Sequence, residues 1–177
     1  MRLVNTSAAA RLTGLSTNQL REWTSRRALI PADVQHRGRG SPSQYSWQTL
    51  LLLRIAAVLK NRFHLELHAH RELFATMRNS FDGVSFLRLW GSSIVIYGTD
   101  RWEILEAAKN RRDEGDGLVL HLDSHLKVLT AEFGMPTPAA AAGQLELFPA
   151  RLVRSERMAV GIEEASATQP SRKRRNA

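Results

Sequence analysis

The stretch from Thr6 to Arg27 reads TSAAARLTGLSTNQLREWTSRR and decides how the first half of this chain folds. Its alanine-rich opening favours a short helix over residues 7–12, capped by a threonine or a serine. Gly14 stands where a left-handed residue would end that helix. Ser16 can then cap a second helix, which would run from Thr17 to about Arg27. Two short helices joined by a glycine-containing turn predict a helix-turn-helix, a motif whose second helix enters the major groove of DNA.

The same residues belong to a longer ordered pattern. It runs through Ala9-Ala10-Arg11-Leu12-Thr13-Gly14-Leu15-Ser16, Leu20-Arg21-x-Trp23, Leu29-Ile30-Pro31 and Tyr45-Ser46-Trp47-x-x-Leu50. In order and spacing this pattern resembles the MerR-type winged helix-turn-helix over residues 4–77, under half of the chain. The resemblance implies a DNA-binding domain with Thr17, Asn18 and Arg21 on the recognition helix. It also implies a wing, Asp33 to Tyr45, that grips the neighbouring phosphate backbone.

Three features depart from the pattern of that family. Glu22 stands where an aromatic residue often follows the Leu-Arg pair. Ala28 replaces the usual glycine before the Leu-Ile-Pro element, and the spacing to that element is one residue longer. We therefore expect the end of the recognition helix to be irregular.

The wing segment, residues 34–45, is polar, basic and rich in glycine. Gly38 and Gly40 can adopt positive φ and predict a hairpin, and the arginines flanking the tip could neutralise phosphates. A loose Gly/Arg loop is the alternative, but the position directly after a helix-turn-helix favours the wing. We expect the DNA contacts at Ser16, Thr17, Asn18, Arg21, Arg26, Arg37, Arg39 and Tyr45. Of these, Tyr45 is the residue type that more often packs in a core than stacks on bases.

Composition favours a nucleic-acid partner and excludes several chemistries. Lys and Arg total 25 against 17 Asp and Glu, a formal net charge of +8, which attracts nucleic acid. No cysteine is present, which excludes disulfides, thiolate zinc sites, iron–sulfur clusters and cysteine nucleophiles. The N-terminus lacks the apolar core of a signal peptide, and no apolar run approaches the roughly 20 residues of a membrane helix. We therefore expect a cytoplasmic, nucleoid-associated protein without a membrane partner.

Two further helices are predicted in the first domain, residues 1–78. One runs from Trp47 to Lys60 with Ser46 as its cap, and the next from His64 to Met77. His64 and His68 would lie one turn apart on the fourth helix, a geometry that can chelate a metal ion. Because no carboxylate or cysteine completes the set, we interpret these histidines, together with His70, as solvated, and we expect no metal or cofactor.

Residues 84–134 predict a second, small α+β domain. Strands at Val84–Leu89 and Ser93–Tyr97 would precede a helix over residues 100–112. A third strand, Leu118–Leu122, would follow an acidic turn, and residues 127–133 would extend it or pair with it as a hairpin. The fold class is therefore α+β.

Dimerisation of this protein is expected to differ from that of the family. Many MerR-type regulators dimerise through one long helix after the winged domain, which Gly83 and Gly91 would interrupt here. A homodimer would then use a sheet edge or the helix expected from Asp100. Alternatively, the second domain could sense a small ligand.

Residues 135–177 predict a disordered tail that carries one motif. Gln144-Leu145-Glu146-Leu147-Phe148 resembles the short peptide that binds the bacterial sliding clamp. Leu145, Leu147 and Phe148 would supply apolar contacts, and Gln144 a polar one. A short strand or helix that folds back on the body is the alternative. The basic end, residues 172–175, would add phosphate affinity.

Binding is favoured over catalysis. The sequence has no Gly-x-Ser-x-Gly elbow, no phosphate-binding glycine loop ending in Lys-Ser/Thr, and no His-Glu-x-x-His. Our leading hypothesis is a dimeric, sequence-specific transcriptional regulator of MerR-like type on double-stranded DNA, with RNA polymerase as a candidate further partner. The alternatives are a DNA-processing accessory factor that recruits the sliding clamp, and an antitoxin-like regulator whose second domain binds a toxin.

Overall fold

The computed structural model describes residues 2–36, 38, 41–106 and 116–138. Within these residues the chain combines helices with two small antiparallel sheets, so the expected α+β class is confirmed. The first part contains β1 (Val4–Asn5), α1 (Thr6–Thr13), α2 (Thr17–Arg21), the π-helix η1 (Glu22–Arg26), β2 (Gln44–Tyr45) and α3 (Trp47–Phe63). The second part contains the 3-10 helix η2 (Leu67–His70), α4 (Arg71–Phe81), the 3-10 helix η3 (Phe86–Leu89), β3 (Ser93–Ile96), β4 (Trp102–Leu105), β5 (Leu118–His121) and α5 (Asp123–Phe133).

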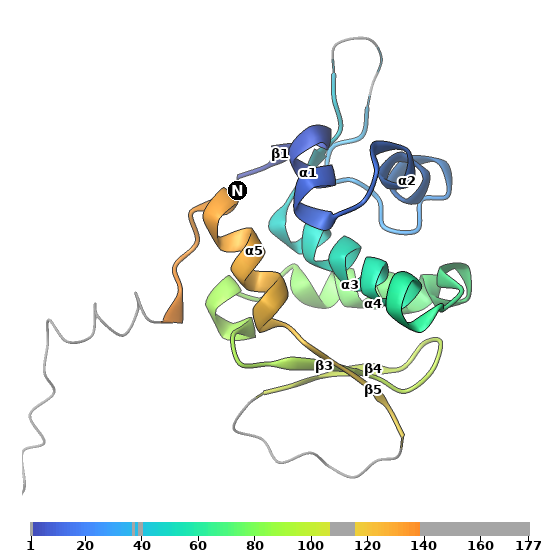
Figure 1. The fold of residues 1–177 in the computed structure, drawn as a ribbon, viewed down its shortest axis with the longest axis vertical. Coiled ribbons are helices and arrows are strands. Elements are labelled where there is room, and N and C mark those ends of the chain that lie inside the picture. The colour runs from blue at the N-terminus through green and yellow to red at the C-terminus, as the bar shows by residue number, and fades with distance from the viewer. Residues whose placement is uncertain (1, 37, 39–40, 107–115, 139–177) are drawn as a thin grey trace, which may run out of the picture.

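The elements form layers around α3. In Figure 1, α3 and α4 lie between the helix-turn-helix on one side and the three-stranded sheet on the other, and α5 runs up toward β1. That sheet has the order β4-β3-β5, and the smaller sheet pairs β1 with β2. A T-shaped contact between the rings of Trp47 and Phe86, 5.2 Å apart, connects the start of α3 to η3. Among the described residues, the buried apolar side chains from Val4 to Phe133, with the exception of Val95, form one continuous core.

The predicted cap is confirmed for the third helix and wrong for the first. Ser46 caps α3 as expected, and its Oγ accepts a hydrogen bond from Thr49 N at 3.2 Å. The cap of α1, however, is Asn5 rather than a threonine or serine, with its Oδ1 accepting from Ala8 N at 3.0 Å. An amide side chain serves this role as well as a hydroxyl does.

The expected fourth helix begins later than predicted. His64 has a φ of 53° and ends α3 as a left-handed C-cap, so it does not lie on a helix face with His68. His70 is buried, and its Nδ1 contacts the carbonyl oxygen of Glu66 at 2.9 Å. The chelating geometry is therefore wrong, and His70 is not a solvated side chain. Within the described part of the chain, no three His, Cys, Asp or Glu side chains are close enough to hold a metal ion.

Three predictions in the second part are wrong. The segment expected as a strand at Val84–Leu89 forms η3, in which Phe86 and Leu89, three residues apart, are both buried. The described start of the expected helix from Asp100 contains β4, because pairing with β3 over Ile96↔Trp102 to Ser93↔Leu105 outweighs local helix propensity. Residues 127–133 belong to α5 rather than to a strand. Its Leu126, Leu129 and Phe133 recur at helical spacing and are buried.

The predicted strands at residues 93–97 and 118–122 are present as β3 and β5. Helix α5 then packs against α3 and meets α1 through an ion pair between Arg11 and Glu132, whose atoms Nη2 and Oε2 lie 2.6 Å apart. No helix in the described ranges is long and apolar enough to span a bilayer.

Candidate nucleic-acid interface

The turn between α1 and α2 forms as its residue types require. Gly14 has a φ of 72°, and its N–H donates to Ala10 O at 3.0 Å, which ends α1. Ser16 then starts α2 with a capping box. Gln19 N donates to Ser16 Oγ at 3.2 Å, and Ser16 N donates to Gln19 Oε1 at 3.1 Å. The predicted helix-turn-helix geometry is thus present.

Helix α2 presents a polar face to solvent. Leu20 is fully buried and Trp23 is 5% exposed, and together they fix the inner side of the helix. Thr17, Asn18 and Arg21 are exposed on the other side, as is Ser16 at the cap. Three donors or acceptors within one turn and a half of helix are the kind of surface that reads base edges in a major groove. These four side chains are therefore accessible, and their contact with DNA stays a prediction.

The end of α2, the predicted recognition helix, is irregular as expected. After Arg21 the backbone widens into η1, and Arg27 N donates to Glu22 O at 2.8 Å. The carboxylate of Glu22 also pairs with the side chain of Arg27 at 2.6 Å and with that of Arg26 at 3.7 Å. Ala28 follows with a φ of 46°, which is the left-handed conformation that a glycine would adopt without strain.

The wing is a hairpin at its base. Val34 N donates to Gln44 O at 3.2 Å, and Gln44 N donates back to Val34 O at 2.9 Å. Gly38 has a φ of 107°, as its place near the reversal predicts. Residues 37, 39 and 40, and with them the proposed phosphate contacts of Arg37 and Arg39, lie outside the described residues.

A carboxylate that sequence reasoning missed anchors the wing. The Oδ2 of Asp33 accepts from Ser46 N at 2.7 Å, and its Oδ1 accepts from Ser46 Oγ at 3.0 Å. The guanidinium of Arg78, on α4, pairs with the same carboxylate at 3.4 Å and donates to Pro31 O. These contacts tie the first strand of the wing to α3 and α4. The sequence offered no signal for this, because Asp33 and Arg78 are 45 residues apart.

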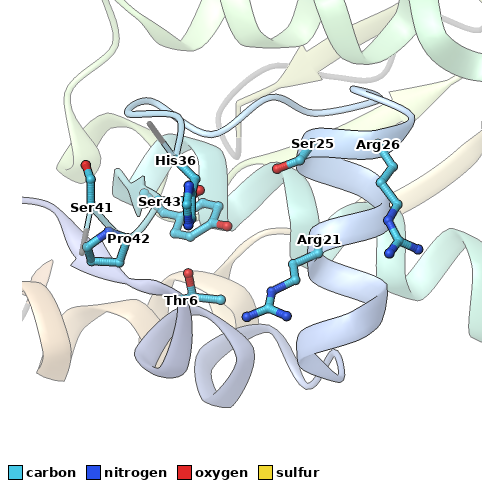
Figure 2. Close-up of a pocket in the computed structure, with 9 residues that line it drawn as sticks. Thr6, Arg21, Ser25, Arg26, His36, Ser41, Pro42 and Ser43 are labelled. Atoms are coloured by element: carbon cyan, nitrogen blue, oxygen red, sulfur yellow. The ribbon is translucent and has the colours of Figure 1, made fainter. Parts of the chain in front are cut away.

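A hollow of about 500 Å³ lies between α1, α2 with η1, and the wing. Its lining combines polar and cationic side chains with apolar surface, from Thr6, Arg21, Ser25, Arg26, His36, Ser41, Pro42, Ser43 and Tyr45. In Figure 2, the guanidinium of Arg21 points from its helix toward Thr6, whereas that of Arg26 points out on the far side of the helix. His36 comes from the wing, and its Nδ1 accepts from Gly38 N at 2.9 Å. An open, cationic concavity of this kind suits a phosphate group.

Tyr45 requires a correction. Its side chain is 1% exposed, and its hydroxyl lies 3.4 Å from Thr24 Oγ1 in the core. The ring fixes the return strand of the wing against the helices, so it is not placed to stack on a base. The proposed partner-binding residues Gln144, Leu145, Leu147 and Phe148 lie outside the described residues.

The side chains with a resolved change of pKa lie away from this interface. The pKa of His125, on α5, is lowered to about 4, chiefly by burial and in addition by charge repulsion from the nearby Arg54 and Arg62. Burial also lowers the pKa of Arg54, whose guanidinium donates to Leu12 O. Both groups lie between α5 and the helix-turn-helix rather than in the hollow.

Comparison with models of protein families and with curated proteins finds no match for this chain.

Proposed function

We propose that this protein is a sequence-specific DNA-binding transcriptional regulator. The observation that carries the proposal is the exposed polar face of α2 beside the cationic hollow and the anchored wing. Helix α2 would enter the major groove with Thr17 and Asn18 at base edges, and Arg21 at a base or an adjacent phosphate. The wing would lie along the neighbouring backbone, and the net charge of +8 would favour association. On this proposal the protein acts at the nucleoid.

The architecture supports binding better than chemistry. Among the described lining residues, no hydrogen bond pairs a hydroxyl with a base and none is a carboxylate: Ser25 and Ser43 lie there with arginines and His36. Hydroxyls, the guanidinium of Arg21 and an imidazole around a water-accessible concavity are donors for a phosphodiester oxygen.

The test is selection of bound duplexes from a random pool, followed by affinity measurements with variants. Wild-type protein should enrich a defined sequence, and Arg21→Ala should weaken binding to that sequence about tenfold to a hundredfold while changing random-duplex binding much less. Lys127→Ala removes the same charge from the exposed surface of α5 and serves as the matched control. An unchanged ratio of operator to random binding in Arg21→Ala would refute the assignment of α2.

The Gln144–Phe148 peptide supports a second candidate, a DNA-processing accessory factor that recruits the sliding clamp. The apolar pair Leu147 and Phe148 would be its anchor. Retention of the intact chain on purified clamp, lost in a Leu147→Ala/Phe148→Ala variant, would favour this role. No retention of the intact chain would remove it.

A further inference from the structure

Strand β4 occupies the place where the sequence predicted a helix, and it lies at an edge of its sheet. The order β4-β3-β5 puts β3 in the centre. Among the described residues, β4 pairs with β3 alone. An edge strand is a template for a further strand, and proteins usually shorten, charge or cover such edges.

The backbone groups that face outward can be identified. Tyr97 N donates to Arg101 O at 3.0 Å, so Arg101 directs its carbonyl toward the β3 side. Residues alternate along an antiparallel ladder, so Trp102 and Ile104 direct their N–H and C=O groups away from β3. No hydrogen bond to these four groups from any described residue is present.

The edge is bordered by a hollow of about 410 Å³ whose lining is partly apolar and partly polar, with Ser80 and Glu103 among its polar residues. Val84, Leu89, Trp102 and Ile104 line it, and Arg88 and Glu106 pair across its rim at 3.4 Å. The apolar lining offers contact area to a strand that adds here, in addition to the backbone hydrogen bonds.

The charges along β4 are arranged in a self-complementary order. Arg101 and Glu103 are two residues apart and therefore lie on the same face of the sheet. The guanidinium of Arg101 lies 4.5 Å over the ring of Tyr97, and the hydroxyl of Tyr97 donates to the carboxylate of Glu103. Both charged groups are thus held in place beside the edge.

Only one two-fold antiparallel register sets these opposite charges against each other. Centred on Trp102, it sets Arg101 of each copy opposite Glu103 of the other, which is a stabilising cross-strand pair. A register centred on Glu103 would oppose two carboxylates, and one centred on Ile104 would oppose Glu103 with Leu105. Complementary charge therefore favours a second copy of this chain as the occupant.

We propose that two copies of this protein dimerise by antiparallel pairing of their β4 strands, centred on Trp102. The sheet lies across α3 and α4 from α2 (Figure 1), so dimerisation leaves both recognition helices accessible. The pairing does not require DNA, and its test is independent of the proposed function.

The test is a charge swap in the full-length chain, followed by sedimentation equilibrium without DNA. Wild-type protein should be a concentration-dependent dimer. Arg101→Glu and Glu103→Arg should each raise the dimer Kd about tenfold or more, because two attractive pairs become repulsive. The double variant Arg101→Glu/Glu103→Arg should restore most of the affinity. Lys127→Glu, an equal charge reversal on the exposed face of α5, should leave the Kd unchanged.

Circular dichroism and thermal unfolding establish that each variant is folded. A folded wild-type protein that stays monomeric up to about 100 μM would overturn the proposal. Its dimer Kd would then exceed that of a specific interface of ordinary size. A dimer whose Kd is unaffected by the single reversals would also overturn it, as would single reversals that weaken the dimer without rescue in the double variant.

Discussion

Ala28 holds a backbone conformation that its side chain disfavours. Its φ of 46° lies in the left-handed region, where a Cβ is crowded by the backbone. Replacement by glycine should relieve this strain in the folded state, although it also raises the conformational entropy of the unfolded chain. Because the relieved strain is the larger of the two effects, we expect Ala28→Gly to stabilise the fold by about 0.5–1 kcal/mol. Urea unfolding measures the change.

The matched control is Ala75→Gly at an exposed position inside α4. There glycine brings only its entropic cost, and we expect a loss of about 1 kcal/mol. If both variants were destabilised equally, Ala28 would not be strained.

Asp33 holds the wing in place through one carboxylate. We expect Asp33→Ala to destabilise the fold by about 1 kcal/mol, since Ser46 N and the guanidinium of Arg78 both lose a partner. If the wing contacts DNA as proposed, the variant should also lose duplex affinity beyond what its unfolded fraction explains. Asp82→Ala, an exposed position at the end of α4, is the control and should change neither quantity.

Among the elements, the start of α2 has two proposed roles, capping of the helix and contact with DNA, which can be tested separately. Ser16→Ala removes the Oγ that accepts the hydrogen bond from Gln19 N, while the backbone N–H of residue 16 can still donate to Gln19 Oε1, and it should cost about 1 kcal/mol of stability. Ser16→Asp keeps an acceptor for Gln19 N, so it should retain stability while placing a carboxylate against DNA phosphate. We therefore expect Ser16→Asp to be as stable as wild type yet weaker in duplex binding. Equal duplex affinity in Ser16→Asp would show that Ser16 lies away from the DNA.

Elements with a local determinant could be predicted from the sequence. Gly14 with Ser16 defines the turn of the helix-turn-helix, and Ser46 defines the start of α3, because caps and left-handed positions depend on a few neighbouring residues. The exposed face of α2 followed from the spacing of Leu20 and Trp23. These elements supply the helical side of the candidate site.

Elements that depend on distant partners could not be predicted. Residues 102–105 become a strand through pairing with β3, and the anchoring of the wing needs Arg78 from another helix. The prediction for residues 127–133 is wrong because this segment is only the end of a helix, and the helical spacing of its buried side chains begins before it, at Leu126. Tertiary pairing outweighs helix propensity in residues 102–105, whereas in residues 127–133 too few turns of the helix are present to show its period.

For the whole molecule, the packing of α5 on the helix-turn-helix makes stability depend on pH. His125 is buried, its Nδ1 has no hydrogen-bond partner in the described residues, and its pKa is lowered from 6.5 to about 4 by burial and by Arg54 and Arg62. The unfolded chain therefore binds a proton on this histidine at a higher pH than the folded chain does. Stability should fall as the pH drops from 6.5 and should level off near 4.

We expect this histidine to account for about 1 kcal/mol of the stability lost between about pH 7 and about pH 5, after allowance for partial solvent screening. His125→Leu, which fills the same space without titrating, should remove that share of the acid loss. The same change at exposed His68 is the control and should leave the loss in place. Chemical denaturation at both pH values measures the difference.

Arg54 also donates to Leu12 O at the end of α1. If α5 supports the orientation of the recognition helix, weaker packing of α5 at acid pH should therefore be accompanied by weaker duplex binding. Parallel acid loss of DNA affinity in wild type and His125→Leu would show that α5 stabilises the fold without orienting that helix.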